Sequence, residues 1–298
     1  MQLRSGPTLV RVSWALLPLT VGPALGAALD DRARAIALTG SGLVWALWAA
    51  VLVAVLVPRT VSLTALRIAA PAALGAAGWA AITDPREAGS VVGVTWAAIT
   101  ALVAFAPSIG DCFVNGSSYG DERRMPLRPP GALLLGPIEL TWAAVVAAPV
   151  GVPLLVAAER WVAAGALAVV GVPAMVVGGR ALHGLARRWI VFVPAGVVLH
   201  DLHAMVDPVL FPRPSIQRLG PARATDHGAL DLTRAAPGLA LELELTEPAE
   251  LAPRRRDRTV HVEHAQRVLF TPTRPGAVLT EAVRRGIAVA PPATPQVT

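Results

Sequence analysis

Six apolar stretches follow one another through the first 180 residues of the chain. They cover residues 12–29, 35–57, 62–82, 91–107, 132–156 and 161–177. Each is near the length that a helix needs to cross about 30 Å of hydrocarbon at about 1.5 Å per residue. Backbone groups without partners are costly in lipid, so these stretches are predicted to be helices, with kinks at their internal prolines. The pattern therefore predicts an all-α transmembrane bundle of about six spans over residues 1–180.

After residue 188 the spacing of the hydrophobic residues changes from the period of a helix to the two-residue period of a strand. The segment LALELELT places Leu239, Leu241, Leu243 and Leu245 on one face, as in a half-buried antiparallel strand. Similar short runs predict strands at residues 189–193, 197–202, 209–211, 215–219, 229–232, 260–262 and 267–270. An amphipathic helix is predicted over residues 275–287, with Arg284 and Arg285 near its C-terminal end. Residues 181–288 are therefore predicted to form a small mostly-β domain with one closing helix, followed by a disordered tail at 289–298.

The composition supports this division. The chain is 54% hydrophobic and 15% charged, with a mean hydropathy of +0.56, which excludes an ordinary single-domain cytosolic enzyme. Only 21 of its charged residues lie in the first 180 positions, against 25 in the remaining 118. The net charge of +6 comes from arginine alone, because the chain has no lysine. Its single cysteine, Cys112, excludes an intramolecular disulfide and a cysteine-based zinc site.

The arginines of the short loops predict the orientation. With the N-terminus in the cytoplasm, nine arginines flank the inner ends of the spans and four flank the outer ends, as the positive-inside rule favours. We therefore expect a multi-pass protein of the plasma membrane with both termini in the cytoplasm. The first span has a second interpretation, because Arg4 and Arg11 precede an apolar run that ends in small residues, as in a cleavable signal peptide.

Two charged residues fall inside predicted spans. Arg67 lies seven residues past Thr60 and Glu139 lies seven past Ala132, so their depths below the cytoplasmic side match. One hypothesis is that they form an ion pair or line a polar pocket, since an intramembrane charge is costly and often functional. The alternative is that Arg67 extends to the headgroups and Glu139 is protonated or interfacial.

The predicted loop 108–131 concentrates polar chemistry. Its segment GDCFVNGSSYGDERRMPLRPPG supplies seven candidate binding residues: Asp111, Asn115, Tyr119, Asp121, Glu122, Arg123 and Arg124. Exposed amides near Gly116 and Gly120, together with the two arginines, could bind a phosphate or a lipid headgroup. The three carboxylates could instead hold Mg²⁺. A hydrated connector without function is the third interpretation.

Two further features lie in the C-terminal region. Arg254, Arg255, Arg256 and Arg258 form a basic cluster that could face an anionic leaflet at about 1 kcal/mol per residue, or could form a solvated turn. The histidine pairs 200/203 and 261/264 have a spacing that points to opposite faces of a strand. We therefore expect no metal site and no cofactor.

The residues of the C-terminal region also carry a family resemblance. RWIVFVPAGVVLHD from Arg188, PSIQRLG from Pro214 and the final helix after TPTRP resemble the bacterial pleckstrin-homology-like domains of multi-pass membrane proteins. Combined with the GDCFVNGSSYGDERR loop, the chain is similar to actinobacterial integral membrane proteins that carry such a domain. The resemblance implies a membrane-associated interaction module and supplies no catalytic residues.

Two functions follow from these features. The first is an interaction protein whose partners are the bilayer, a cytoplasmic protein or anionic lipid headgroups, and not nucleic acid. The second is a transporter or lipid-processing enzyme that uses Glu139, Arg67 and the polar loop. A transporter usually shows paired internal repeats, which we do not find, and a lipid phosphate enzyme usually shows more closely spaced carboxylates. The first interpretation therefore leads, and the question of catalysis stays open.

Overall fold

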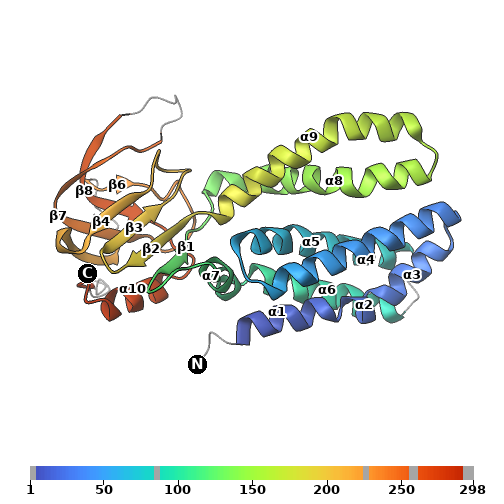
Figure 1. The fold of residues 1–298 in the computed structure, drawn as a ribbon, viewed down its shortest axis with the longest axis horizontal. Helices are drawn as coiled ribbons and strands as arrows, with labels where there is room; N and C mark the ends of the chain where they lie inside the picture. Colours follow the sequence, from blue (N-terminus) through green and yellow to red (C-terminus); the bar gives the residue numbers. More distant parts are fainter. Residues whose placement is uncertain (1–4, 84–87, 224–227, 255–260, 291–298) are drawn as a thin grey trace, which may run out of the picture. The chain divides into compact units, whose positions relative to one another are not determined.

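The chain forms two compact units in the computed structural model, which describes residues 5–83, 88–223, 228–254 and 261–290 (Figure 1). The first unit comprises residues 1–117 and 138–183, and the second comprises residues 118–137 and 184–298. The sequence analysis assigned residues 118–137 to the membrane domain. They fold instead with the C-terminal region, so the chain passes between the two units three times.

Helices build the first unit. They are α1 (Ser5–Ala15), α2 (Leu17–Thr20), α3 (Gly22–Asp30), α4 (Arg34–Leu56), α5 (Thr60–Thr83), α6 (Ala88–Phe105), α7 (Pro107–Asn115), α8 (Pro137–Ala157) and α9 (Trp161–Ala186). Four of them, α4, α5, α8 and α9, are long and apolar enough to cross a membrane. The pair α6 and α7, bent by 56°, makes a fifth candidate if it is one span. The first predicted span consists of the three short helices α1–α3, and the count of six stays a prediction.

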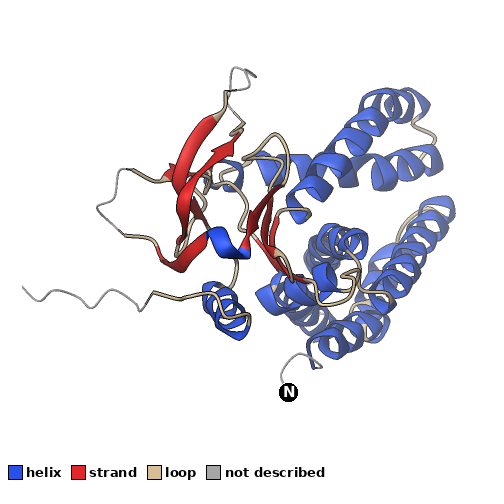
Figure 2. Cartoon of the chain, turned by 60° about the vertical axis from the view of Figure 1, so that its left-hand side comes forward, coloured by secondary structure: helices blue, strands red, loops and turns tan. Residues whose placement is uncertain are grey.

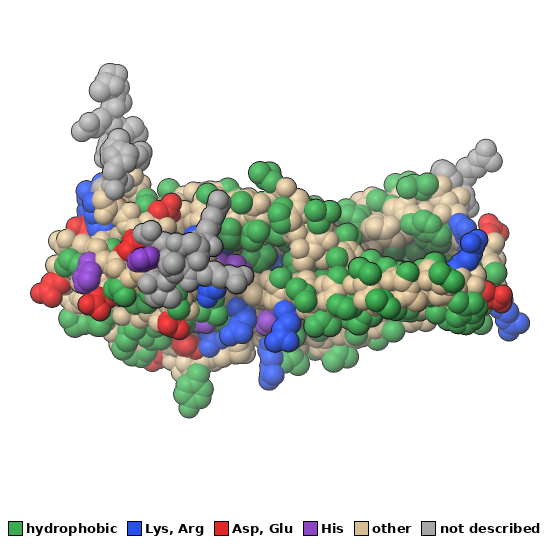
Figure 3. Space-filling model, turned by 90° about the horizontal axis from the view of Figure 1, so that it is seen from above, with side chains coloured by type: hydrophobic (Ala, Val, Ile, Leu, Met, Phe, Trp, Pro, Cys, Tyr) green, Lys and Arg blue, Asp and Glu red, His purple; other side chains and the backbone are tan. Residues whose placement is uncertain are grey.

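The surface of these helices suits an apolar solvent. Large side chains such as Ile82, Leu102 and Val162 are exposed, whereas small side chains such as Ala70 and Ala77 are buried. In lipid, small residues let helices approach closely while large apolar side chains face the acyl chains. On the face seen in Figure 3, hydrophobic side chains cover the helices and charged ones gather at the helix ends.

The break between α1 and α2 shows how the bundle satisfies its backbone. Pro18 has no N–H and cannot donate to the carbonyl of Trp14, four residues earlier. The indole of Trp48 on α4 donates to that carbonyl at 3.1 Å, and the indole of Trp14 donates to the Trp48 carbonyl at 3.0 Å. Trp96 on α6 donates to the carbonyl of Ser13 at 2.9 Å. Side chains of neighbouring helices therefore occupy acceptors at the break, as a water-free surrounding requires.

Two four-stranded sheets and one helix build the second unit. The first sheet is antiparallel in the order β1 (Arg123–Pro126), β2 (Trp189–Val193), β3 (Gly196–His200), β4 (Val209–Pro212). The second has the order β5 (Ile216–Pro221), β7 (Leu241–Leu251), β8 (Glu263–Phe270), β6 (Leu230–Asp231), with β6 parallel to β8. The final helix is α10 (Pro275–Arg284). Figure 2 shows the strands of this unit as two groups.

The core of the second unit is shared by both sheets and the helix. Phe192 and Phe211 from the first sheet, Phe270 from the second and Val278 from α10 are fully buried in one cluster. Leu241, Leu243 and Leu245 are buried as their alternation predicts, whereas Leu239 precedes the strand and is exposed. The sheet-rich C-terminal region with a final helix is therefore confirmed.

The segment between α7 and α8 is an integral part of this unit. Its strand β1 pairs with β2, so that Met125 lies opposite Ile190. Beyond the strand, the Leu127 N–H donates to the Arg188 carbonyl and the Arg128 N–H to the Thr271 carbonyl, both at 2.9 Å. A predicted strand at residues 260–262 is not seen: residue 260 lies outside the described residues, and β8 begins at Glu263.

Candidate anion-binding site

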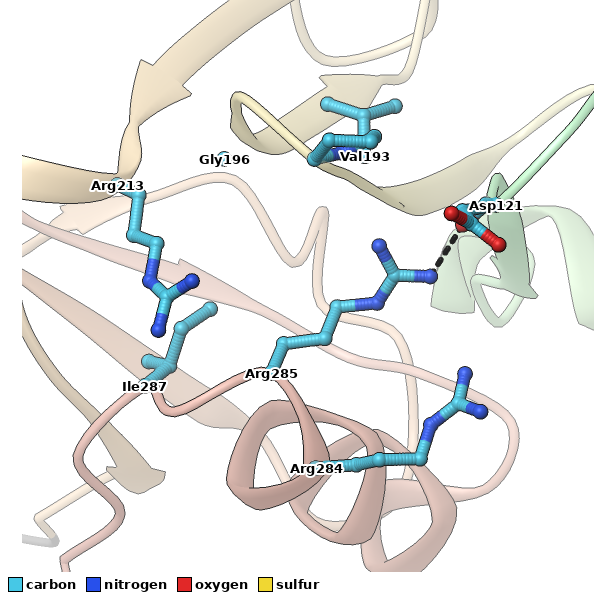
Figure 4. A pocket seen from close by; sticks show the side chains of 8 residues that line it. Asp121, Val193, Gly196, Arg213, Arg284, Arg285 and Ile287 are labelled. Atoms are coloured by element: carbon cyan, nitrogen blue, oxygen red, sulfur yellow. Dashed lines mark hydrogen bonds between the residues drawn. The ribbon is translucent and has the colours of Figure 1, made fainter.

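An open pocket of about 310 Å³ lies in the second unit between the β2–β3 turn, the end of α10 and the segment that leads to β1 (Figure 4). Its lining is rich in cations. The residues that line it are Asp121, Val193, Pro194, Gly196, Arg213, Arg284, Arg285 and Ile287. Three guanidinium groups and one carboxylate therefore meet at one opening.

Glu281 fixes two of the three arginines. Its carboxylate accepts from Arg284 at 2.7 and 2.9 Å and from the Nε of Arg285 at 2.6 Å. Burial alone would raise the pKa of Glu281, but the hydrogen bonds and charges of the two arginines outweigh burial and hold this pKa below its ordinary value. Both cations also lie at the C-terminal end of α10, where the helix dipole favours positive charge.

Arg285 makes a second contact, which joins α10 to the segment between α7 and α8 (residues 116–136, the inter-helix segment). Its guanidinium donates to the backbone carbonyl of Asp121, as the dashed line in Figure 4 shows. The Arg285 side chain is 16% exposed, whereas that of Arg284 is 67% exposed. Arg285 is therefore held on two sides at the pocket, whereas Arg284 is held by Glu281 and is more exposed at the rim.

Arg213 reaches the same pocket from the chain that follows β4. It begins a short 3₁₀ helix, Arg213–Ser215, and its backbone N–H donates to the Ala195 carbonyl at 2.9 Å. Its guanidinium lies against Gly286, where a Cβ would come within 2.4 Å of Nη2. Gly286 has a φ of +69°, which also favours glycine. Across the described part of the chain, the Arg213 side chain takes part in no ion pair.

A second, larger pocket of about 530 Å³ adjoins the first and shares Pro194, Arg213 and Ile287 with it. The rest of its lining is mainly apolar and consists of Ala195, Pro214, Ile216, Gln217, Gly286 and Ala288. Arg213 therefore lies between a compartment that it shares with two other arginines and one whose lining has no other charged side chain.

The structure divides the seven candidate binding residues of the polar loop between the two units. Asp111 and Asn115 lie on α7 in the first unit, where the Asn115 amide donates to the Asp111 carbonyl at 2.7 Å. Asp111 is buried. The stretch expected to be a loop from residue 108 onward is therefore helical as far as Asn115.

The other five candidates lie in the second unit. Glu122 accepts from the backbone of Tyr119 at 3.2 Å and from Arg124 at 2.9 Å, and Arg124 lies 5.5 Å above the ring of Trp189. Arg123 begins β1, and Tyr119 is 91% exposed. Asp121 is the one member of this group that lines the arginine pocket.

Arg67 lies at the bend between α6 and α7. It donates to the Ala104 carbonyl at 3.4 Å and lies 5.6 Å from the Phe105 ring. The Ala104 carbonyl is one of the last carbonyls of α6, so the guanidinium caps the C-terminal end of this helix. Glu139 is exposed in the first turn of α8, and the contacts described for Arg67 do not include it. The proposed pairing of these two residues thus gains no support.

Other predicted sites add little. Arg254 is exposed, and Arg255, Arg256 and Arg258 lie outside the described residues. Within the described ranges, no group of three or more His, Cys, Asp or Glu side chains is arranged to hold a metal ion.

Comparison with known proteins identifies no relative: no protein-family model, curated protein or solved structure matches this chain. The function is therefore argued from the geometry. From the sequence, Arg284 and Arg285 are predicted only as charges at a helix end, and Arg213 is not predicted as a site residue. Its position between Pro212 and Pro214, directly after a predicted strand, is the one signal that marks it in the sequence.

Proposed function

We propose that this chain is a multi-pass membrane protein that presents a pleckstrin-homology-like domain to the cytoplasm as an interaction module for a protein partner or lipid headgroups. The observation that carries the proposal is that the second unit is made of two separate segments of the chain. It contains the segment between α7 and α8 as well as everything after α9. The domain is thus joined to the helices at three points of the chain.

This connectivity supports one topology. Residues 118–137 and 184–298 fold together, so both must lie on the same side of the membrane. Helices α8 and α9, which lie between them in the chain, then cross as a hairpin with its turn near Arg160 on the opposite side. The arginines that flank the shared side outnumber those on the other, which favours the cytoplasm for the domain.

Several features favour an interaction module over a transporter or a lipid-processing enzyme. Two sheets around one core, completed by a C-terminal helix, agree with the pleckstrin-homology-like resemblance. Arg67, a candidate for the alternative function, is used to cap a bent helix. The polar loop contributes a strand and a pocket wall to the domain.

Labelling of single cysteines tests the topology, since Cys112→Ser removes the only native thiol. In that background we introduce Tyr119→Cys, Glu247→Cys or Arg160→Cys, all at exposed positions. A membrane-impermeant maleimide should label intact cells only at position 160, and should label positions 119 and 247 after permeabilisation. Labelling of 119 and 247 on different sides, or of both from outside, would contradict the proposal.

The interaction itself is tested by a photoreactive amino acid in place of Tyr119, two residues before the pocket wall. Irradiation of intact cells should give covalent adducts with a specific protein or lipid. The same amino acid at position 160 serves as the matched control. Equal adduct patterns at the two positions would contradict an interaction module.

A further inference from the structure

We propose that the pocket between Arg213 and Arg285 binds a phosphate group. This inference names the ligand chemistry of the interaction module and so rests on the proposed function. The groups that carry it are the guanidinium of Arg213, which has no acidic partner among the residues that the structure describes, and that of Arg285, which is already oriented by Glu281.

The charge balance of the pocket leaves room for an anion. Arg213, Arg284 and Arg285 contribute three positive charges, while Asp121 on the wall and Glu281 behind it contribute two negative charges, so one positive charge remains. A guanidinium presents a planar fork of donors that matches the oxygens of a phosphate. A phosphate would therefore supply a counter-charge that no described side chain gives Arg213.

The arrangement is built before any ligand arrives. Arg285 is fixed by the Glu281 carboxylate and the Asp121 carbonyl. Arg213 is fixed at its backbone by Ala195, and the absence of a side chain on Gly286 gives its guanidinium room beside the chain. Groups that are already ordered lose little conformational entropy on binding.

The adjoining pocket, whose lining has no charged side chain besides Arg213, indicates what is attached to the phosphate. Arg213 lies between the cationic compartment and a wall that includes Pro214, Ile216 and Ile287. A ligand with a phosphate next to an apolar group fills both compartments. A lipid phosphate has this chemistry, and so does a soluble organic phosphate. Free inorganic phosphate would fill only the compartment with three arginines.

Native mass spectrometry of the detergent-solubilised full chain tests the inference. The probes are dihexanoyl phosphatidate, dihexanoyl phosphatidylcholine and inorganic phosphate. We expect a phosphatidate adduct that is at least tenfold tighter than the phosphatidylcholine adduct, because the choline headgroup adds a positive charge near the arginines. If inorganic phosphate binds as tightly as phosphatidate, the site takes the free anion, which also supports the inference.

Variants locate the binding site. Arg213→Gln should weaken binding at least tenfold, and Arg213→Lys, which keeps the charge, should restore part of it. Arg234→Gln is the matched control, because it removes an exposed arginine of the same domain outside the pocket. Unchanged hydrogen exchange in β4 and α10 would show that the variants are folded.

Two results would overturn the inference. One is that neither phosphatidate nor inorganic phosphate binds to the native chain. The other is that Arg213→Gln binds them as tightly as the native chain does. Neither result bears on the cysteine labelling, so the domain would remain assigned to its side of the membrane while its ligand chemistry would be wrong.

Discussion

Removal of the Asp201 carboxylate probes the join between the inter-helix segment and the C-terminal domain. Asp201 accepts two hydrogen bonds from Arg188, at 2.7 Å from Nε and 2.6 Å from Nη2. The two side chains are 1% and 2% exposed. The same guanidinium donates to the Arg128 carbonyl, so one ion pair holds together β2, the end of β3 and the inter-helix segment. The variant Asp201→Ala leaves Arg188 buried without its counter-charge.

The expected cost follows from this burial. Removal of one partner from a buried ion pair destabilises proteins by about 3–5 kcal/mol, because the remaining charge stays desolvated. Since about 1.4 kcal/mol corresponds to a factor of ten, the strands around the pair should open at least about 100-fold more often. Loss of an exposed pair costs about 1 kcal/mol or less. Glu122→Ala breaks the pair with Arg124, whose side chains are 25% and 19% exposed, so it should cost less than the loss of the fully buried Asp201 and is the matched control.

Hydrogen–deuterium exchange of the detergent-solubilised full chain measures these openings peptide by peptide. Exchange in β2, β3 and residues 123–128 should accelerate together in Asp201→Ala and hardly at all in Glu122→Ala. The double variant Arg188→Met/Asp201→Leu, which removes both charges, should recover most of the protection. An acceleration below about fivefold in Asp201→Ala would refute the reasoning, as would acceleration in β2 without the inter-helix segment.

Three further predictions concern other parts of the chain. Trp48→Phe removes the indole donor at the α1–α2 break and should lower stability in detergent by about 1–2 kcal/mol. Trp45→Phe, which changes an exposed neighbouring indole, should leave stability unchanged. Thermal melting compares the two variants. Gly116→Ala places a Cβ 1.8 Å from a backbone oxygen and should cost at least about 2 kcal/mol in the same assay, whereas Gly75→Ala meets no atom and should be neutral. Because the pKa of Glu281 lies below its ordinary value, its contribution to stability is present above about pH 4.5 and is lost as the pH falls through the folded-state pKa. Denaturant titrations at several pH values should therefore show that Glu281→Gln loses less stability below pH 4.5 than the native chain does. A variant whose stability has the same pH profile as that of the native chain would contradict the ion-pair argument.

Local patterns predicted the elements whose cause is local. The sequence pattern located β2 at Trp189–Val193 and the buried face of β7. A strand that is buried on one face has apolar residues at every second position, so the sequence itself shows the pattern. The long apolar helices α4, α5, α8 and α9 were likewise visible, since length and apolar content define them.

Elements that depend on distant partners were not predicted. Strand β1 has the sequence RRMP, which carries two charges and a proline and shows no alternation. It is a strand because β2 pairs with it, and strand propensity depends strongly on such context. The arginine pocket was missed for the same reason, because Arg213 and Arg285 are far apart in the chain and only tertiary packing brings them together.

The position of β1 between α7 and α8 also governs the order in which this protein can be made. A ribosome releases β1 before the two helices that follow it, and its partner β2 emerges only after both have been synthesised. The nascent β1 therefore has no neighbouring strand while α8 and α9 are being synthesised. A fragment that starts at β2 would lack the edge strand, and a chain that stops after α9 would leave that strand without a neighbour. Completion of the first sheet is thus coupled to the synthesis of both long helices.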